Sequence, residues 1–382
     1  MSRHVLRGRV VLPDAVLEDG VVVVDDDRIT LVGPADELGD ALPEPLGILI
    51  PGLVDVHCHG GGGASFTLGD DAQVSSAAAH HLTQGTTSVV ASAVTDSPER
   101  MVAAVRAAAR ATARGEVAAI HLEGPFLSPA RCGAQDPRHL RLPDLGLARE
   151  LLQAGEGHVW VMTVAPELPG ADGLVDLLME HGVVAAVGHT EASAATTERV
   201  LATQDAGLAT HLFNGMPPLH HRDPGPVAGA LAAARRGNAR VELIADGVHL
   251  ADETVALVFS LLGAERVVLV TDAMAAAGMP DGDYRLGPQD VTVRDGVARL
   301  RGDGGETSIA GGTARLVDVL RRVVQQSGVG LVDAVASATH VPASVLGLDD
   351  VGSLTVGLRA DVLVVDDFLR PQRVMKAGAW VG

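Results

Sequence analysis

Short apolar runs alternate with alanine-rich segments through residues 51–345, and this alternation constrains the fold more than any other feature. The apolar runs have the length of strands, and the segments between them have the composition and length of helices. Repeated strand–helix units over such a length favour an α/β protein with a parallel (β/α)8 TIM-type barrel, although an open doubly wound sheet would show the same periodicity. The expected strands include 87–91, 117–121, 158–164, 183–187, 208–211, 241–245 and 267–271, and the expected helices include 99–114 and 191–202.

The two ends of the chain have a different sequence pattern, which is typical of short strands and tight turns. We expect residues 1–50 and 346–382 to assemble a small β-sandwich domain beside the barrel of residues 51–345. Glycine, proline and aspartate interrupt the strand–helix pattern between 275 and 312. We expect a β-hairpin insertion near 280–305, close to the mouth of the active site.

Composition excludes several classes of partner. A formal charge of −19 argues against a nucleic-acid or anionic-membrane surface, but it leaves room for one small anionic ligand in a local basic pocket. Two cysteines make no disulfide framework, and the first residues lack the apolar stretch of a signal peptide. No apolar run approaches the roughly 18 residues that span a bilayer. We therefore expect a soluble, cytoplasmic protein that binds neither nucleic acid nor membrane.

An apolar run that starts at Ile48 ends in a pair of histidines, His57 and His59, with Cys58 between them. In an extended segment the two imidazoles point to the same face, where they can chelate a divalent metal. Taken alone, the pair is more simply interpreted as a hydrogen-bonded strand end.

Further ligand-type residues end other apolar runs. Glu123 precedes a Gly-Pro turn, His189 follows Gly188, and His211 and Asp272 follow two more predicted strands. If residues 51–345 form a barrel, all of these side chains lie at the carboxyl-terminal rim, where barrel active sites form. Each residue alone would be an ordinary turn or loop residue, and other histidines (His121, His158 and His181) are interpreted as structural. Together they predict a site for one or two Zn²⁺-like ions, with ligands His57, His59, Glu123, His189, His211 and Asp272.

The motifs around these residues resemble those of the N-acetylglucosamine-6-phosphate deacetylase family of the amidohydrolase superfamily, over nearly the whole chain. His-X-His and a late aspartate are typical of the superfamily, whereas Leu-Glu-Gly-Pro and His-Leu-Phe-Asn-Gly-Met-Pro are close to family-specific. The similar stretches are Pro51-Gly-Leu-Val-Asp-Val-His-Cys-His-Gly60, His121-Leu-Glu-Gly-Pro-Phe126, Gly188-His-Thr190, Thr210-His-Leu-Phe-Asn-Gly-Met216, Ala245-Asp-Gly-Val-His249, Thr271-Asp-Ala-Met274 and Gly357-Leu-Arg-Ala-Asp-Val-Leu-Val364.

The resemblance implies a metal-dependent hydrolase of amide bonds in amino sugar catabolism or cell-wall sugar recycling. It would convert N-acetyl-D-glucosamine 6-phosphate and water to D-glucosamine 6-phosphate and acetate. Two divalent ions per subunit are implied, zinc first and Fe, Co, Cd or Mn as alternatives. Glu123, His189 and His211 would hold one ion, and the second would be held by His57, His59, Glu123 and Asp272. As the catalytic residue, Asp272 would take a proton from the attacking water and deliver it to the leaving nitrogen.

The resemblance also implies a set of substrate contacts. One departure is Gln135, which stands where many relatives carry a histidine; a glutamine donates a hydrogen bond but cannot take up a proton. Arg222 would reach into the neighbouring subunit's site, so a homodimer or dimer-based oligomer is expected. Without the resemblance Arg222 would be a solvated loop charge. The implied substrate-binding residues are Ala134, Gln135, Asn214, Gly215, Arg222, Asp246, His249, Ile309, Ala310 and Gly311.

Three alternatives remain: another amidohydrolase such as a cyclic amidase or an N-acyl-amino-acid deacylase, a non-catalytic barrel scaffold, and a structural-zinc protein. Arg222 and the 214–216 stretch disfavour the first, because its substrates carry no phosphate. The persistence of all six ligand-type residues disfavours the second, and the lack of thiolate ligands disfavours the third. The sequence leaves open the metal's identity and the range of N-acyl groups and sugars accepted.

Overall fold

The computed structural model describes residues 2–38, 42–204, 207–302 and 308–382. Within them, parallel strands pair in the order β14-β13-β12-β11-β10-β9-β8-β5. The ends of this order meet where the His59 N–H donates to the Ala273 carbonyl at 2.7 Å and the Asp272 N–H donates to the His57 carbonyl at 2.9 Å. The sheet therefore closes, and the prediction of a (β/α)8 barrel is confirmed. The strands are β5 (Leu53–Cys58), β8 (Thr86–Val94), β9 (Ala119–Glu123), β10 (Val159–Val164), β11 (Val184–Val187), β12 (Gly207–Ala209), β13 (Ala239–Leu243) and β14 (Val267–Leu269).

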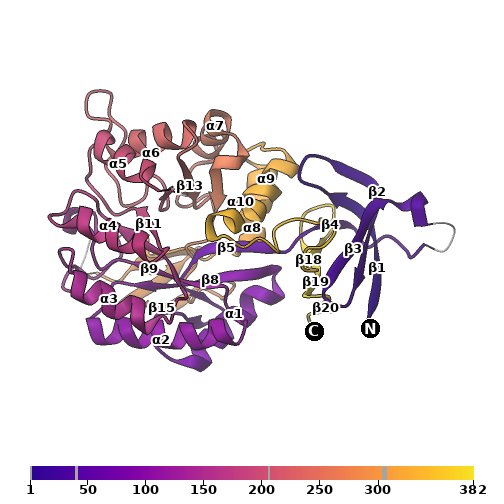
Figure 1. Cartoon of the computed structure of the whole chain (residues 1–382), viewed down its shortest axis with the longest axis horizontal. Coiled ribbons are helices and arrows are strands. Elements are labelled where there is room, and N and C mark those ends of the chain that lie inside the picture. The colour runs from indigo at the N-terminus through magenta and orange to yellow at the C-terminus, as the bar shows by residue number, and fades with distance from the viewer. Residues whose placement is uncertain (1, 39–41, 205–206, 303–307) are drawn as a thin grey trace.

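Helices follow the barrel strands and cover the outside of the barrel (Figure 1). In the second of them, the Ser97 side chain accepts the Arg100 N–H as an N-cap. Its buried face, which includes Met101, Val105 and Ala108, packs against the strands. The helices are α1 (Asp71–Thr83), α2 (Pro98–Ala113), α3 (Leu145–Ala154), α4 (Ala171–Glu180), α5 (Ala194–Ala202), α6 (Gly225–Arg235), α7 (Asp252–Leu262) and α8 (Leu316–Gln325).

Aliphatic side chains fill much of the barrel interior. Val54, Val90 and Val161 form a buried cluster there with Val341 and Leu346 of helix α10 (His340–Leu346), which follows α9 (Leu331–Ala338). In such barrels the active site forms beyond the packed interior, at the carboxyl-terminal ends of the strands.

Strands from both chain ends form a second sheet, which stands beside the barrel and contains both termini (Figure 1). Strand β18 pairs antiparallel with β4, so the C-terminal strands join the N-terminal ones directly. The prediction of a separate β unit built from both termini is therefore confirmed. In the described residues its order is β20-β19-β18-β4-β1-β2-β3. The strands are β1 (Arg3–Val11), β2 (Val16–Asp25), β3 (Arg28–Pro34), β4 (Ile48–Pro51), β18 (Val362–Val365), β19 (Pro371–Lys376) and β20 (Ala379–Trp380).

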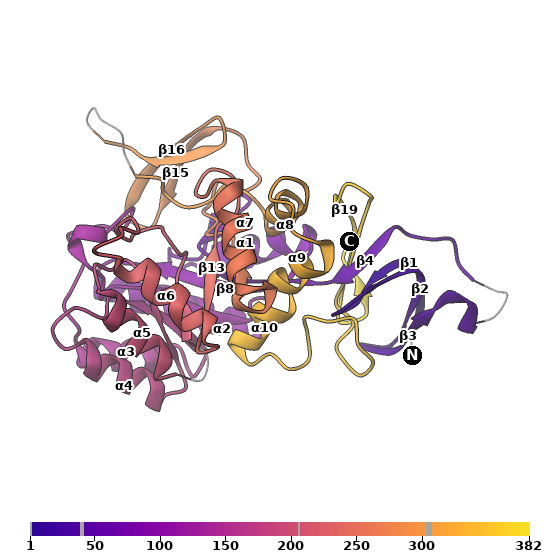
Figure 2. The same cartoon turned by 90° about the horizontal axis from the view of Figure 1, so that it is seen from above.

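The segment after β14 carries an antiparallel sheet of β15 (Gly282–Leu286), β16 (Gln289–Arg294) and β17 (Val297–Leu300), which lies along one side of the barrel in Figure 2. The hairpin of β16 and β17 lies within the insertion expected near 280–305, and β15 extends that hairpin to a three-stranded sheet. Residues 303–305 of the expected insertion lie outside the described residues.

Short elements complete the chain. Strands β6 (Gly60–Gly61) and β7 (Ala64–Ser65) follow β5, and 3-10 helices cover Ala35–Leu38, Pro129–Arg131 and Ala264–Arg266. In the part of the chain that the structure describes, we find no helix with both the length and the apolar character needed to cross a membrane.

Candidate active site

Three ligand-type residues lie just beyond strand ends in an unusual backbone conformation. His189 follows β11, His211 follows β12 and Asp272 follows β14, with φ angles of 47°, 29° and 47°. Left-handed backbone costs a non-glycine residue about 1–3 kcal/mol and persists only where surrounding structure imposes it. The recurrence of this strained conformation at three strand ends points to a functional site.

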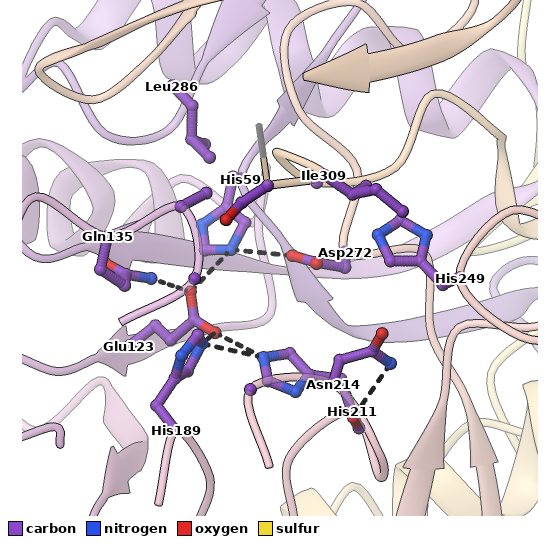
Figure 3. A pocket seen from close by; sticks show the side chains of 15 residues that line it. His59, Glu123, Gln135, His189, His211, Asn214, His249, Asp272, Leu286 and Ile309 are labelled. Carbon is purple, nitrogen blue, oxygen red and sulfur yellow. Dashed lines mark hydrogen bonds and ion pairs between the residues drawn. The ribbon is translucent and has the colours of Figure 1, made fainter. Parts of the chain in front are cut away.

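Glu123, the last residue of β9, lies between two pairs of histidines, His57 with His59 and His189 with His211. Figure 3 shows Glu123 with His59, His189 and His211. Its Oε1 is 3.0 Å from His189 Nε2 and 2.9 Å from His211 Nε2. Its Oε2 is 3.3 Å from His59 Nε2, and its Oε1 is 3.6 Å from His57 Nε2. One buried carboxylate therefore faces both pairs.

Within each pair the two Nε2 atoms are unusually close, at 3.1 Å for His57 and His59 and 3.1 Å for His189 and His211. In three of these rings Nδ1 faces an oxygen that can accept its hydrogen bond, so the neutral form of the ring has its lone pair on Nε2. Two such lone pairs repel unless a positive charge lies between them. The acceptors are Glu242 Oε2 at 3.0 Å for His57, the Ser92 carbonyl at 3.1 Å for His59 and the Arg131 carbonyl at 2.7 Å for His189.

The donor set fits divalent metal ions. A zinc ion bonded to two nitrogens at about 2.0–2.1 Å in tetrahedral geometry would hold them about 3.3 Å apart, close to the spacing in each pair. Asp272 adds a carboxylate oxygen 3.1 Å from His59 Nε2 and 3.4 Å from His57 Nε2. Among the described residues, two groups bring their ligand atoms within 4.8 Å of one another and could each hold an ion: His57–His59–Glu123 and Glu123–His189–His211.

The electrostatics of the site favour positive charge between the carboxylates. Burial lowers the pKa of His57, but Glu242, Asp272 and Glu123 outweigh burial and raise this pKa to about 10. Burial likewise opposes the rise in the pKa of His59, which Asp272 and Glu123 bring to about 9. Burial alone would raise the pKa of Asp272, yet the neighbouring histidines hold it below its usual value. The site therefore attracts cations.

These groups open into a cavity of about 270 Å³. The structure brings most of the expected substrate residues to it: Ala134, Gln135, Asn214, Gly215, His249, Ile309 and Gly311 line the cavity with His59, Glu123, His189, His211 and Asp272. Leu286 of β15, which the sequence analysis did not single out, also lines it. In Figure 3, Gln135 and Leu286 lie on one side of the cavity, and Asn214 and His249 lie on the other.

Three expected substrate residues do not line the cavity. Asp246 lies behind His249 and accepts from its Nδ1 at 2.9 Å. Ala310 is fully buried in the apolar cluster under the inserted sheet. Arg222 is exposed on the loop after β12, where its Nη1 lies 2.8 Å from His221 Nε2.

Gln135 is fixed at both ends of its amide. Its Oε1 accepts the Thr95 backbone N–H at 2.8 Å, so its Nε2 must face Glu123, whose Oε2 is 2.5 Å away. The residue that departs from the family pattern therefore hydrogen-bonds the carboxylate shared by the two histidine pairs.

Sequence reasoning missed Glu242, a buried residue of β13 that contacts His57. The sequence did contain a signal for Glu242, namely a carboxylate within a predicted barrel strand. Such strands are buried on both faces, so a carboxylate in one of them requires a polar partner. His121, interpreted as structural, is buried with its ring centroid 4.6 Å from that of His57. Its nitrogens lie 3.0 Å from Ser92 Oγ and 2.8 Å from Thr163 Oγ1, an environment that fits that interpretation.

Comparisons with known proteins agree with this geometry. The amidohydrolase family model matches residues 48–381. An N-acetylgalactosamine-6-phosphate deacetylase of Escherichia coli O157:H7 is 34% identical over 98% of this chain and 98% of its own, and an N-acetylglucosamine-6-phosphate deacetylase of Bacillus subtilis (strain 168) is 33% identical over 93% and 91%. A solved structure of an aspartate-to-alanine variant of N-acetyl-D-glucosamine-6-phosphate deacetylase from Mycobacterium smegmatis, in complex with N-acetyl-D-glucosamine-6-phosphate, is 41% identical, with a TM-score of 0.93 over 100% of this chain and 99% of that one.

Proposed function

Because the chain belongs to the amidohydrolase family, we propose that it hydrolyses the acetamide of N-acetyl-D-glucosamine 6-phosphate to D-glucosamine 6-phosphate and acetate. The proposal depends most on the position of Glu123 between two histidine pairs, with Asp272 in the same cavity. Within each pair the two Nε2 atoms are 3.1 Å apart. Relatives similar over nearly the full length bear the names of sugar-phosphate deacetylases, which narrows the reaction class to deacetylation.

We assign one divalent ion to each histidine pair, with Glu123 shared. Imidazole and carboxylate donors suit zinc, and the same set accepts Fe, Co, Cd or Mn. When bound, the ions would activate a water molecule and polarise the carbonyl oxygen of the acetamide. The chain's part is to hold its nitrogens in one protonation state, which the acceptors at Nδ1 of His57, His59 and His189 do.

Asp272 is the proposed proton carrier. Its carboxylate lines the cavity and lies 3.1 Å from His59 Nε2, and the neighbouring histidines keep it ionised. An ionised carboxylate can accept a proton from the attacking water and then deliver it to the nitrogen as the C–N bond breaks. The second transfer matters most, since an amine is a poor leaving group unless it is protonated.

We assign the substrate's phosphate to the side of the cavity lined by Asn214 and His249, away from Gln135. Burial lowers the pKa of His249, but the carboxylate of Asp246 outweighs burial and raises it. His249 can therefore carry positive charge toward an anionic substrate. The acetyl group then points toward Gln135 and the shared carboxylate.

The proposal extends to assembly and location. Arg222 is exposed and lies outside its own chain's cavity, so we assign it to the phosphate in a neighbouring subunit's cavity within a homodimer. A guanidinium fork suits phosphate oxygens through paired hydrogen bonds.

We place the reaction in the cytoplasm, where the two free thiols Cys58 and Cys132 would stay reduced.

Acetate release tests the proposed reaction. We expect kcat/KM for N-acetyl-D-glucosamine 6-phosphate to exceed that for the unphosphorylated sugar about 100-fold, because charge-assisted hydrogen bonds to phosphate contribute roughly 1.5–3 kcal/mol. Equal rates on the two sugars would contradict the phosphate assignment. N-acetyl-D-galactosamine 6-phosphate is a second candidate substrate, which the 34% identical relative from E. coli favours. A faster rate on this sugar than on N-acetyl-D-glucosamine 6-phosphate would change the assigned sugar but not the assigned reaction.

A further inference from the structure

Glu242 contacts one histidine of each pair, His57 and His211. It belongs to β13, is 1% exposed and does not line the cavity, so it is not placed to contact substrate. Its Oε2 accepts a hydrogen bond from His57 Nδ1 at 3.0 Å and another from the backbone N–H of His211 at 3.0 Å. One oxygen therefore holds a residue of each pair.

A buried carboxylate has to be stabilised by its partners. Removing a charge from water costs several kcal/mol unless hydrogen bonds or opposite charge compensate. The hydrogen bonds that the Glu242 carboxylate receives within the described residues come from His57 and His211. The carboxylate and the ligands are thus mutually dependent.

For His57, the contact fixes the ring. A carboxylate at Nδ1 keeps the proton on that nitrogen and leaves the Nε2 lone pair facing His59, 3.1 Å away. Carboxylates that orient a ligand histidine in this way also raise its basicity and commonly change metal affinity 10- to 100-fold when they are removed.

For His211, the contact fixes the backbone. Its Nδ1 is buried without a hydrogen-bond partner among the described residues, so its ring lacks the anchor that His57, His59 and His189 have. Its backbone is in the left-handed region at a φ of 29°. The hydrogen bond from its N–H to Glu242 is therefore a main constraint on where its Nε2 points.

We propose that Glu242 is a positioning residue on which both metal positions depend, because it holds His57 through the ring and His211 through the backbone. The inference rests on the proposed metal site but not on the identity of the substrate. It adds to the site a residue that neither binds a metal ion nor contacts the substrate.

Metal affinity tests this directly. Metal-stripped wild-type protein, Glu242→Gln and Glu242→Leu would be titrated with Zn²⁺ against a chromophoric chelator and with Co²⁺ by visible absorption. We expect Glu242→Leu to bind both ions at least 10-fold more weakly and to change the Co²⁺ spectrum. Glu242→Gln should lose less, because its amide oxygen can still accept both hydrogen bonds. Asp361→Asn is the matched control, since Asp361 is a buried carboxylate of the terminal β unit paired with Arg359, and its metal affinity should equal wild type.

Wild-type affinity for both ions in Glu242→Leu would overturn the proposal, as would an equal loss in the Asp361→Asn control. If Glu242→Leu fails to fold by circular dichroism, Glu242→Gln and Glu242→Asp decide. Aspartate is one methylene shorter and should not reach both partners, so wild-type affinity in both variants would also overturn it. A wild-type protein that releases no acetate would refute the proposed reaction while leaving this affinity comparison intact.

Discussion

At the scale of single residues, the conformation of Asp272 depends on its backbone neighbours. Its N–H donates to the His57 carbonyl at 2.9 Å, and its carbonyl accepts from the Gly312 N–H at 2.7 Å. These two hydrogen bonds hold it at a φ of 47°, which turns the carboxylate toward His59. Gly311 lies close by: a Cβ added there would sit 2.9 Å from the Asp272 carbonyl oxygen, so a side chain at 311 would push the aspartate.

Asp272→Asn should lower kcat on N-acetyl-D-glucosamine 6-phosphate by about 100- to 10,000-fold, because an amide cannot take up and return the proton. The amide is close in shape to the carboxylate, so equilibrium substrate binding should remain measurable. Steady-state kinetics, substrate binding and metal content would be measured on one sample, with Asp361→Asn as a buried-carboxylate control. A rate near wild type in Asp272→Asn would remove it from proton transfer.

Residues that end apolar runs, such as Glu123 and His189, were predictable as site candidates because a polar group at a barrel strand end faces the rim. Glu242 was not identified, because it lies inside the apolar run 241–245 and its partner His57 is far away in sequence. The contact of Gln135 with Glu123 was also beyond sequence reasoning, since it depends on the Thr95 amide that orients the glutamine.

At the scale of elements, the inserted sheet supplies part of the cavity wall. Leu286, the last residue of β15, packs in an apolar cluster with Val291 of β16 and also lines the cavity on the side of Gln135. That is the side to which we assign the acetyl group. The inserted sheet would therefore limit the length of the N-acyl chain.

Leu286→Ala should raise the ratio of kcat/KM for the N-propionyl sugar phosphate to that for the N-acetyl one about 10-fold, since one methylene in an apolar pocket is worth about 1–3 kcal/mol. Val291→Ala is the control: it shrinks the same cluster and does not line the cavity. Competition assays with both substrates give the ratio. If the ratio changes equally in the two variants, or in neither, the inserted sheet does not set acyl length.

The order of strands and helices followed from the hydrophobic pattern, but strand ends did not. The strand expected at 208–211 ends at Ala209, because His211 has a φ of 29° that a strand cannot continue. Likewise β14 ends at Leu269 rather than 271, before the turn that carries Asp272. Functional strain shortened the elements at the positions where the site residues lie.

At the scale of the whole molecule, the proposed homodimer would make each active site a property of two chains. Arg222 lies on the loop between β12 and α6, outside its own cavity, while Asn214 and Gly215 of the same loop line that cavity. A neighbouring subunit could supply the arginine across a two-fold interface. Each site would then combine the Asp272 of one subunit with the Arg222 of the other.

Mixing variants tests this arrangement. Arg222→Ala should raise KM for the phosphorylated sugar, and Asp272→Asn should lower kcat by about 100- to 10,000-fold. With the substrate kept well below the KM of Arg222→Ala, each variant alone should be far less active than wild type. Co-refolded in equal amounts, they should recover roughly a quarter of wild-type activity, because half of the randomly formed dimers carry one complete site of two. Light scattering would establish that the sample is dimeric. No gain over the sum of the separate variants would show that Arg222 serves its own chain or none.

The central claim is that Glu123 and the two histidine pairs hold the metal ions that make the chain an amide hydrolase. The most direct test is to titrate the metal-stripped protein with Zn²⁺ and to follow acetate release from N-acetyl-D-glucosamine 6-phosphate. We predict no release without metal, and a rate that rises to its maximum at two ions per chain in wild type. His57→Gln with His59→Asn should bind one ion only. Full activity in metal-free protein, or two ions still bound in the double variant, would contradict the account.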